Sequence, residues 1–561
     1  MSRPDWIILV LTLLGVIAYG LYKSRTSRDL DGYFLANRMV PWYMVLLGIM
    51  GTQASAVTFL SAPGQAYTDG MRFVQYYFGL PLAMVVLCIT FVPAFHKLKI
   101  YTAYEFLEQR FDLKTRTLTS FLFLLQRGLS TGISISAPSI ILSSLLGWDI
   151  VWTNIFMGGL LIIYTVTGGA KAVAYTQQLQ LIIIFGGMFV AGYMVVHRLP
   201  EGVGFSEALH IGGKAGKLNI ITTGIDGKGF SWNDRYNLFS GIIGGFFLAL
   251  SYFGTDQSQV GRYLTARSVS ESRLGLLMNG LVKVPMQFLI LLVGVLVFAF
   301  YQFNPEPVFF NQSQLDKLAK SKYRDSLIVL ERSYAETERL RTSTVAVPTA
   351  PQLAEIVSAK AGYRSTIKRW LNDVGGDDND TNYIFLRFVT DYLPKGLVGL
   401  LIAVIFLAAW GSIAATLNSL SSCTIVDFHR RFSRPLSPEK EFRLSRVYTF
   451  FWGVFCVAVA QLAYNLGNSL IEAVNVLGSL FYGVILGIFL VAFYRKKVGA
   501  TAVFISAIII EALVILLNVL SRKGIISLSF LWFNVVGAAG VVLLSEAIQL
   551  ISSKLNTRHK D

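Results

Sequence analysis

The sequence predicts an all-α polytopic membrane protein, and three observations lead to this fold class. Of its 561 residues, 54% are hydrophobic and only 15% carry a charge, which is too apolar for a soluble protein of this length. About thirteen apolar runs are long enough to cross a bilayer as helices. One of these runs, at 46–64, is interrupted in its middle by small and polar residues.

The apolar runs define the predicted transmembrane helices in chain order. They lie at 5–22, 42–63, 73–95, 118–146, 150–168, 177–197, 238–255, 278–301, 396–424, 446–465, 470–494, 498–519 and 527–550. The first run lacks the basic leader and the small-residue cleavage site of a signal peptide, so we expect it to remain as a helix.

Basic residues in the short loops give the predicted orientation. The loops within 23–38, 97–116, 262–273, 430–446 and 495–497 are rich in lysine and arginine, whereas the loops between them are poor. Since cytoplasmic loops carry the excess of basic residues, we expect an outside N-terminus, a cytoplasmic C-terminus and residence in the plasma (inner) membrane. The net charge of +16 then faces anionic membrane lipid, and we expect no nucleic-acid partner.

The interruption at 46–64 is the most informative local feature. The residues at 51–56 are all small or polar, and none has a bulky side chain. Lipid cannot hydrogen-bond exposed backbone, so such a break is tolerated only where protein or a watery cavity surrounds it. Freed carbonyls and a serine hydroxyl at mid-membrane are typical of the ion and substrate site of a secondary transporter. A second interrupted span at 241–257 fits a paired break in the other half of the chain.

Two segments are predicted to leave the membrane on the outer face. Residues 198–237 have the composition of a loop, and 302–395 form a longer insertion. The charged middle of that insertion, at 312–341, predicts one or two exposed helices that are too polar for a large core. The insertion could act as a lid or as a surface for a partner, or it could be a solvent-exposed addition without a function of its own.

The residues offer no catalytic constellation. Cys88, Cys423 and Cys456 fall within predicted spans and suggest neither disulfides nor a metal site. The five histidines do not cluster, and no phosphate-binding loop, hydrolase, metalloprotease or kinase motif occurs. We therefore expect a protein that is not an enzyme.

Several longer stretches carry a resemblance to a known family. They are DGYFLANRMVPWY at 31–43, IYTAYEFLEQRF at 100–111, YTVTGGAKAV at 164–173, DQSQVGRYLTARS at 256–268, YLPKGLVGLL at 392–401 and LAAWGSIAATLNS at 407–419. Together they resemble the sodium:solute symporters, which include sodium/glucose, sodium/iodide and sialic-acid transporters. The resemblance implies a LeuT-like fold of two inverted five-helix repeats plus flanking helices, and transport by alternating access.

The resemblance also implies a division of the chain. Residues 1–41 would hold a leading transmembrane helix and a cytoplasmic loop, 42–197 the first five-helix repeat, 198–237 the external loop, 238–494 the second repeat with the external insertion 302–395, and 495–561 two trailing transmembrane helices and a short cytoplasmic tail.

By position, the resemblance puts a sodium site between the broken helix and the helix at 396–424. One side would supply the backbone carbonyls of Gly51 and Ala54. The other would supply the carbonyl of Ala408, the hydroxyl of Ser412 and a group at Gly411. These last three are spaced i, i+3, i+4 and share one helix face. Neutral oxygens in a tight cluster suit a monovalent hard cation.

Four positions depart from the family pattern around this site. Gly411 stands where members commonly have a second hydroxyl, and Gln177 stands where they have an aspartate. Ala414 and Ala415 replace the hydroxyls of a second sodium site, which we therefore expect to be absent. The expected cofactor is one coupling sodium ion. Thr416 or a water molecule would complete its ligands. The alternative is a different coupling ion.

The predicted substrate site starts on the broken helix. Ser55 and Thr58 lie three residues apart, and the resemblance to sialic-acid transporters gives them substrate-contacting hydroxyls; helix packing is the alternative. Gln53 precedes them as a further contact. Phe73 would wall the pocket or simply pack. Tyr77 replaces an acidic sugar ligand of bacterial galactose relatives and so argues against a sugar.

Arg127 is predicted to lie roughly 14 Å inside its span, at 1.5 Å per residue. A lone arginine at that depth usually marks function or a buried pair. No acidic residue in a neighbouring span is an obvious partner. Three roles stay open: recognition of an anionic substrate group, a bond to broken-helix carbonyls, and snorkelling to the surface.

Three further residues complete the predicted substrate site. Tyr252 matches the aromatic residue that closes the site from the inside in the family, and Asn475 is a polar candidate on the span at 470–494. Lys283 aligns with a sugar-contacting lysine of the galactose relatives, although its place near the cytoplasmic end also allows snorkelling. Ala249 replaces an asparagine of the sugar site, which again weakens a sugar assignment.

The predicted function is cation-coupled symport of a small organic solute, driven by one sodium ion, with an anion favoured over a hexose. Proton-coupled or ion-independent transport by the same fold is an alternative. A passive channel would need a continuous polar pore, whereas the sequence offers isolated polar groups. The expected partners are the small-molecule solute and membrane lipid, with no obligate protein partner evident.

Overall fold

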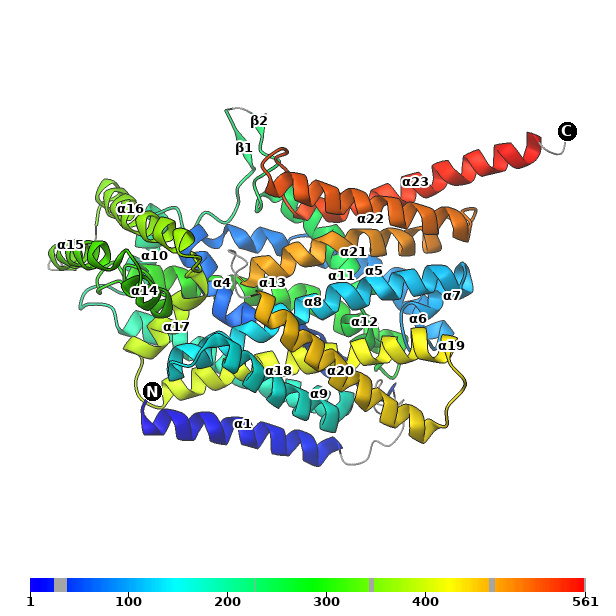
Figure 1. Ribbon diagram of the computed structural model, residues 1–561, viewed down its shortest axis with the longest axis horizontal. Helices are drawn as coiled ribbons and strands as arrows, with labels where there is room; N and C mark the ends of the chain where they lie inside the picture. The colour runs from blue at the N-terminus through cyan, green and yellow to red at the C-terminus, as the bar shows by residue number, and fades with distance from the viewer. Residues whose placement is uncertain (25–37, 228, 343–347, 464–469, 559–561) are drawn as a thin grey trace.

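Long apolar helices lie side by side and form the body of the molecule (Figure 1). The computed structural model describes residues 1–24, 38–227, 229–342, 348–463 and 470–558. The predictions for the basic loop at 25–37 and for the short loop at 466–469 fall outside the described residues.

The elements of the first half include a bent pair, α3 and α4, near the N-terminus. In order they are α1 (Arg3–Ser24), α3 (Trp42–Gln53), α4 (Ala56–Asp69), η2 (Met71–Tyr77), α5 (Leu80–Ile89), α6 (Phe91–Leu98), α7 (Glu105–Arg110), α8 (Leu113–Leu146), α9 (Ile150–His197), α10 (Phe205–Lys214), β1 (Ile225–Asp226) and β2 (Gly229–Phe230).

The second half contains another interrupted pair and the long helix α18. Its elements are η3 (Ser240–Gly244), α11 (Gly245–Thr255), α12 (Gln257–Leu264), α13 (Val269–Phe300), α14 (Gln312–Ala319), α15 (Arg324–Thr342), α16 (Ala350–Asp373), α17 (Thr381–Tyr392), α18 (Leu397–Cys423), η4 (Thr424–His429), α19 (Arg430–Phe432), α20 (Pro438–Ala463), α21 (Leu470–Tyr494), α22 (Ala500–Arg522) and α23 (Leu531–Arg558).

These helices account for every predicted span. Ten helices of the described chain are long and apolar enough to cross a membrane, and α3 with α4 forms one bent pair. Two shorter apolar helices, Ile150–Val166 and Ser240–Thr255, cover the remaining runs. Helices satisfy their own backbone groups, which lipid cannot do, so long apolar sequence folds in this way. The predicted all-α polytopic fold is confirmed.

Helix α9 bends between two predicted spans. The hydroxyls of Tyr164 and Thr176 lie 2.8 Å apart and share a hydrogen bond. Along a straight helix these residues would be separated by about 18 Å, at 1.5 Å per residue. The chain must therefore bend between them, where the apolar segments Ile150–Val166 and Tyr175–His197 of the two predicted spans, 150–168 and 177–197, meet.

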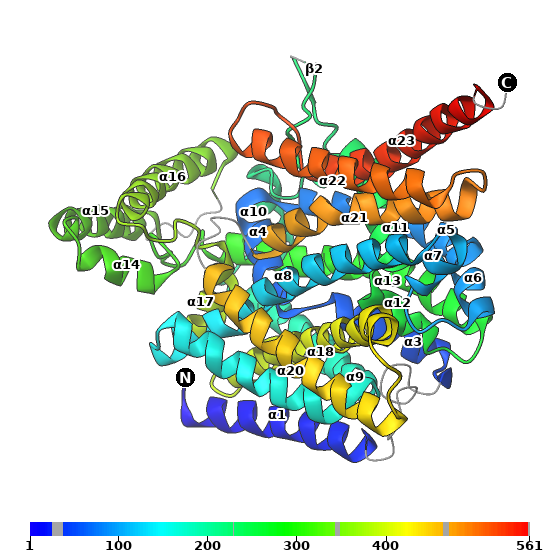
Figure 2. The same cartoon turned by 45° about the vertical axis from the view of Figure 1, so that its right-hand side comes forward.

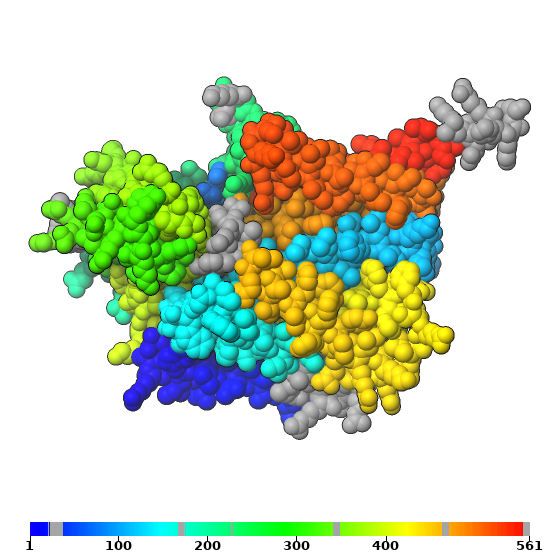
Figure 3. Space-filling model, in the orientation of Figure 1, coloured from blue at the N-terminus to red at the C-terminus, as the bar shows by residue number. Residues whose placement is uncertain are grey.

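Both outer segments hold more regular structure than the sequence predicts. The expected loop at 198–237 contains α10 and a short antiparallel hairpin of β1 and β2. The charged middle of the insertion forms the two helices α14 and α15, within the one or two predicted for 312–341, and the rest of the insertion adds α16 and α17. Helices α14, α15 and α16 project from one end of the bundle (Figures 1, 2 and 3).

The insertion has a small hydrophobic core of its own, although its composition is polar. The buried residues of this core are Val308, Phe309, Leu315, Leu318, Leu327, Tyr334, Ile367 and Leu371. They are widely spaced along the chain and come from different helices. Because each helix contributes only a few of them, the sequence pattern resembles that of a solvated helix.

Charged side chains fasten the insertion to α4. The hydroxyl of Tyr67 on α4 donates to Glu306 Oε1 at 2.5 Å. Lys360 Nζ lies 2.5 Å from Glu306 Oε2 and 3.2 Å from Glu338 Oε1. Burial raises the pKa of Glu306, but Lys360 and Arg364 outweigh this effect and hold that pKa below its usual range. The outer half of the bent pair is therefore anchored to the insertion.

Helix α17 also packs on α4, and the contact depends on Gly64. A Cβ at Gly64 would overlap the backbone carbonyl oxygen of Thr381. We predict that Gly64→Ala lowers the free energy of unfolding of the detergent-purified protein by about 1–3 kcal/mol, which is the usual penalty of overpacking. The measurement is the unfolding midpoint by intrinsic fluorescence.

Gly159→Ala is the matched control, because a Cβ there meets nothing within 4 Å. It should leave the midpoint unchanged or raise it slightly, as alanine favours a helix over glycine by about 0.5–1 kcal/mol. Equal midpoints for the two variants would contradict the packing of α17 on α4.

Candidate ion and substrate site

The bent pair α3 and α4 changes direction by 62° at its break. Ala54 and Ser55 are the two residues between the helices, and Ser55 has an extended backbone with φ −82° and ψ 171°. Small side chains at this point let neighbouring helices approach the backbone closely. The break predicted within 51–56 is therefore present and lies at the end of α3.

The break deprives the backbone carbonyls of Gly51 and Ala54 of their helical donors. In a regular helix the N–H of Ser55 would bond the carbonyl of Gly51, and the N–H of Thr58 would bond that of Ala54. Here Ser55 N–H donates to Gln53 and Thr58 N–H donates to Ser55, at 3.0 and 2.9 Å. Gly51 and Ala54 are the two residues whose carbonyls the sequence analysis assigns to sodium.

Helix α18 supplies the opposite side of the predicted ion site and packs against α3, α4 and α9. The Ser412 hydroxyl lies 3.0 Å from the carbonyl oxygen of Ala408. Gln177 on α9 joins the two sides, because its Nε2 donates to Thr52 Oγ1 at 3.2 Å and to the carbonyl of Gly411 at 3.1 Å. One amide therefore links the last turn of α3 to α18.

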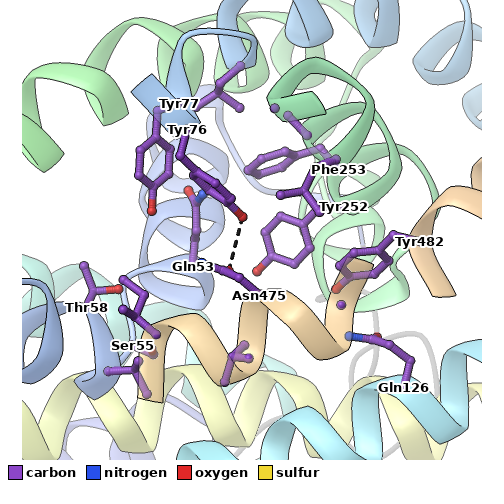
Figure 4. Close-up of a pocket in the computed structure, with 18 of the residues that line it drawn as sticks. Gln53, Ser55, Thr58, Tyr76, Tyr77, Gln126, Tyr252, Phe253, Asn475 and Tyr482 are labelled. Atoms are coloured by element: carbon purple, nitrogen blue, oxygen red, sulfur yellow. Dashed lines mark hydrogen bonds between the residues drawn. The ribbon is translucent and has the colours of Figure 1, made fainter. Parts of the chain in front are cut away.

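A cavity of about 110 Å³ lies beside the break, enclosed by α4, η2, α8, α11 and α21. Its lining includes these predicted substrate residues: Gln53, Ser55, Thr58, Tyr77, Arg127, Tyr252 and Asn475. Figure 4 shows Ser55 and Thr58 on one side of this space, with Tyr252 and Tyr482 on another. The Tyr76 hydroxyl donates to Asn475 Oδ1 at 3.2 Å, so η2 and α21 meet across it.

Two predicted substrate residues do not line the cavity. Phe73 is fully buried and stacks on Tyr76 with ring centroids 5.6 Å apart, which is the packing alternative. Lys283 is 1% exposed, and its Nζ lies 5.5 Å from the ring centroid of Tyr77. The snorkelling alternative for Lys283 is therefore wrong. Its ammonium group finds no hydrogen-bond partner among the described residues.

Arg127 has an acidic partner, contrary to the expectation from sequence. Its Nε lies 3.5 Å from Asp256 Oδ2, and its Nη2 donates to Ser258 Oγ at 2.9 Å. Asp256 separates α11 from α12 and also accepts from the hydroxyl of Tyr482 at 2.7 Å. Arg127 is 8% exposed, so it does not snorkel. It binds side chains at the second break instead of carbonyls at the first.

The cavity also contains residues that the sequence analysis did not assign. Tyr482 and Gln126 are two polar examples. Tyr482 follows Asn475 by seven residues and so shares its helix face, a periodicity that could have identified it. Gln126 directly precedes Arg127 in an apolar run, which is a weaker signal. Within the described chain, no three His, Cys, Asp or Glu side chains lie together in a way that could hold a metal ion.

A helix bundle with freed carbonyls at a break, beside a cavity with several polar side chains, is typical of a secondary active transporter. The profile of the sodium:solute symporter family matches residues 33–319 and 359–510, so the chain belongs to this family. It is a multi-pass membrane transporter that couples sodium to the movement of a small-molecule solute, and it is not an enzyme.

Individual relatives agree with this assignment. The sodium/sialic acid symporter SiaT of Proteus mirabilis is 26% identical over 544 residues, which cover 96% of this chain and 93% of that protein. Sodium-coupled monocarboxylate transporter 1 of Homo sapiens is 26% identical over 513 residues, covering 88% and 70%. A solved structure of a Na⁺-coupled sialic acid symporter in a substrate-bound outward-open state superimposes with a TM-score of 0.75 at 24% identity, covering 98% of both chains. The LeuT-like fold is confirmed.

The pair of Arg127 and Asp256 makes a testable contribution to stability. Asp256→Asn leaves a buried guanidinium without a counter-charge, and we predict a loss of about 3–5 kcal/mol, typical of a broken buried pair. The double variant Arg127→Gln with Asp256→Asn should recover much of that loss, because no unpaired charge remains. Thermal unfolding in detergent is measured for the wild-type protein, for Asp256→Asn, for Arg127→Gln and for the double variant.

Asp373→Asn serves as the control, because its pair with Lys322 is solvent-exposed, with side chains 45% and 66% accessible. The unfolding midpoint of this variant should change little from that of the wild-type protein, because an exposed ion pair contributes little to stability. Strictly additive losses in the double variant would contradict a direct interaction between Arg127 and Asp256.

Proposed function

We propose that this chain moves a small organic anion together with one sodium ion by alternating access. The sodium ion is held between the break in the first bent pair and α18, by Gly51, Ala54, Ala408 and Ser412. The solute binds in the adjacent cavity, against Ser55 and other polar residues of its lining.

The freed carbonyls carry the sodium part of the proposal. Gly51 and Ala54 lose their helical donors at a buried break, and buried backbone oxygens need a replacement partner. A monovalent cation supplies that partner with less net charge than a divalent ion, which would normally recruit carboxylates. Ala414 and Ala415 offer no side-chain oxygen, which supports a single site.

The charges around the cavity favour an anionic solute. Arg127 is paired with Asp256, so these two groups largely cancel. Lys283 lies buried behind Tyr77, with no carboxylate within salt-bridge distance in the described chain. An anionic group bound nearby would favour the charged form of this buried amine and would be attracted by it in turn. The relatives' names also include acids, namely sialic acid and monocarboxylates.

Two further features belong to the proposal. Residues 42–197 and 238–494 would form the two repeats, since each contributes one interrupted helix to the cavity wall. The N-terminus would lie outside and the C-terminus in the cytoplasm of the plasma (inner) membrane. In Figure 1 the N-terminus and the insertion lie at the same end of the bundle.

Uptake into proteoliposomes tests the proposal. We predict that an inward sodium gradient drives accumulation of a labelled monocarboxylate or sialic acid, but not of galactose. Equilibration without any gradient would indicate a channel or uniporter, and a requirement for a proton gradient would overturn the ion assignment.

Ser412→Ala tests the ion site in the same assay. Loss of one ligand to a cation removes about 1.5–3 kcal/mol, so the sodium concentration for half-maximal uptake should rise about 10- to 100-fold. Ser419→Ala is the control, because this buried serine lies two turns further along α18 and bonds only the carbonyl of Ala415. An equal effect of the two variants would contradict a direct ligand role for Ser412.

A further inference from the structure

Gly411 leaves the proposed sodium site one side-chain oxygen short of the family pattern, and a neighbouring side chain fills the space. A Cβ built on Gly411 would overlap Gln180 Oε1, which belongs to α9. The amide oxygen of Gln180 therefore occupies the volume into which a serine or threonine at 411 would project its hydroxyl. This also explains why residue 411 has no side chain.

Gln180 is a buried residue, and its side chain is only 3% exposed. Within the part of the chain that the structure describes, no hydrogen bond to the amide of Gln180 is found. The amide therefore keeps free hydrogen-bonding capacity at a position with little access to water. Such a group is expected to meet a ligand when the site is filled.

Gln177, one helical turn earlier, has a structural role instead. Its Nε2 binds Thr52 and Gly411 and so holds α3 against α18. Its Cγ lies 3.3 Å from the same Cβ position on Gly411. Residues spaced i and i+3 share a helix face. Gln177 therefore sets the separation of the two helices, while the oxygen of Gln180 stays available beside Gly411.

We propose that Gln180 Oε1 is a direct ligand of the sodium ion and replaces the hydroxyl that residue 411 lacks. An amide oxygen is neutral and hard, so it suits an alkali cation as a carbonyl does. The ion would then be bound by backbone carbonyls of α3 and α18, the hydroxyl of Ser412 and one amide of α9. This inference rests on the proposed sodium site and adds a third structural element to it.

Binding of radioactive sodium to the purified full-length protein tests the inference without knowledge of the solute. Gln180→Ala should weaken sodium binding at least tenfold. Gly411→Ser alone should also weaken it, because the new side chain collides with Gln180. The double variant Gln180→Ala with Gly411→Ser should return to within about threefold of the wild-type protein, because the serine hydroxyl enters the vacated space.

Two further variants keep the test decisive. Gln180→Glu retains an oxygen at the same place and adds a negative charge, so sodium binding should be kept or strengthened; a purely structural role predicts weaker binding and lower stability. Gln178→Ala, on the same helix but partly exposed, should bind sodium like the wild-type protein.

The binding experiment distinguishes a wrong sodium site from a wrong role for Gln180. Wild-type protein that binds no sodium would overturn the proposed ion site as a whole. Wild-type protein that binds sodium, with unchanged affinity in Gln180→Ala or with no recovery in the double variant, would overturn the role of Gln180 alone.

Discussion

A helix that breaks inside a bilayer must be enclosed by protein, and this constraint organises the molecule. The carbonyls released between α3 and α4 cannot be satisfied by lipid, so α9, α13, α17 and α18 pack closely around the bent pair. Close contact requires small residues: Gly64 faces the backbone of α17, and Gly51 faces the side chain of Gln177. The same enclosure that makes the break tolerable brings polar atoms of several helices together beside it.

Within that enclosure, neutral oxygens and full charges have separate places. Around the break, the polar groups are neutral: backbone carbonyls, hydroxyls and amides. The charged groups Arg127 and Asp256 meet at the second interrupted helix, on the other side of the cavity. The proposed cation and anionic solute would occupy adjacent positions. Binding of one would reduce the electrostatic penalty of binding the other, which is a physical basis for coupling.

The sequence predicts those features that lipid or local spacing imposes. Every span follows from the need for continuous apolar helices, and the break at Ala54 follows from its small neighbours. The resemblance to a family adds Ser55 and Thr58, and the depth of Arg127 in its span adds a third residue; the structure brings all three to one cavity. Whether these residues bind the ion or the solute stays a prediction.

Features that depend on contacts between distant segments could not be predicted. Asp256 lies far from Arg127 in sequence, and its position in a polar stretch gives no sign of the pairing. Helices α14 and α15 of the insertion follow from their charged, helix-like spacing, but α16 and α17 were not predicted, because each contributes few residues to a buried core. The fit of Gln180 against Gly411 needs three-dimensional geometry, since only the missing Cβ reveals that an oxygen takes its place.

The central claim is that oxygens around the break between α3 and α4 bind an alkali cation together with Ser412. The most direct measurement is a pair of experimental density maps of the same protein, one in sodium and one with sodium replaced by a large organic cation. The account predicts one difference peak between Ala54 and Ser412, in contact with the freed carbonyls. A sodium-dependent peak elsewhere, with none at this break, would contradict it.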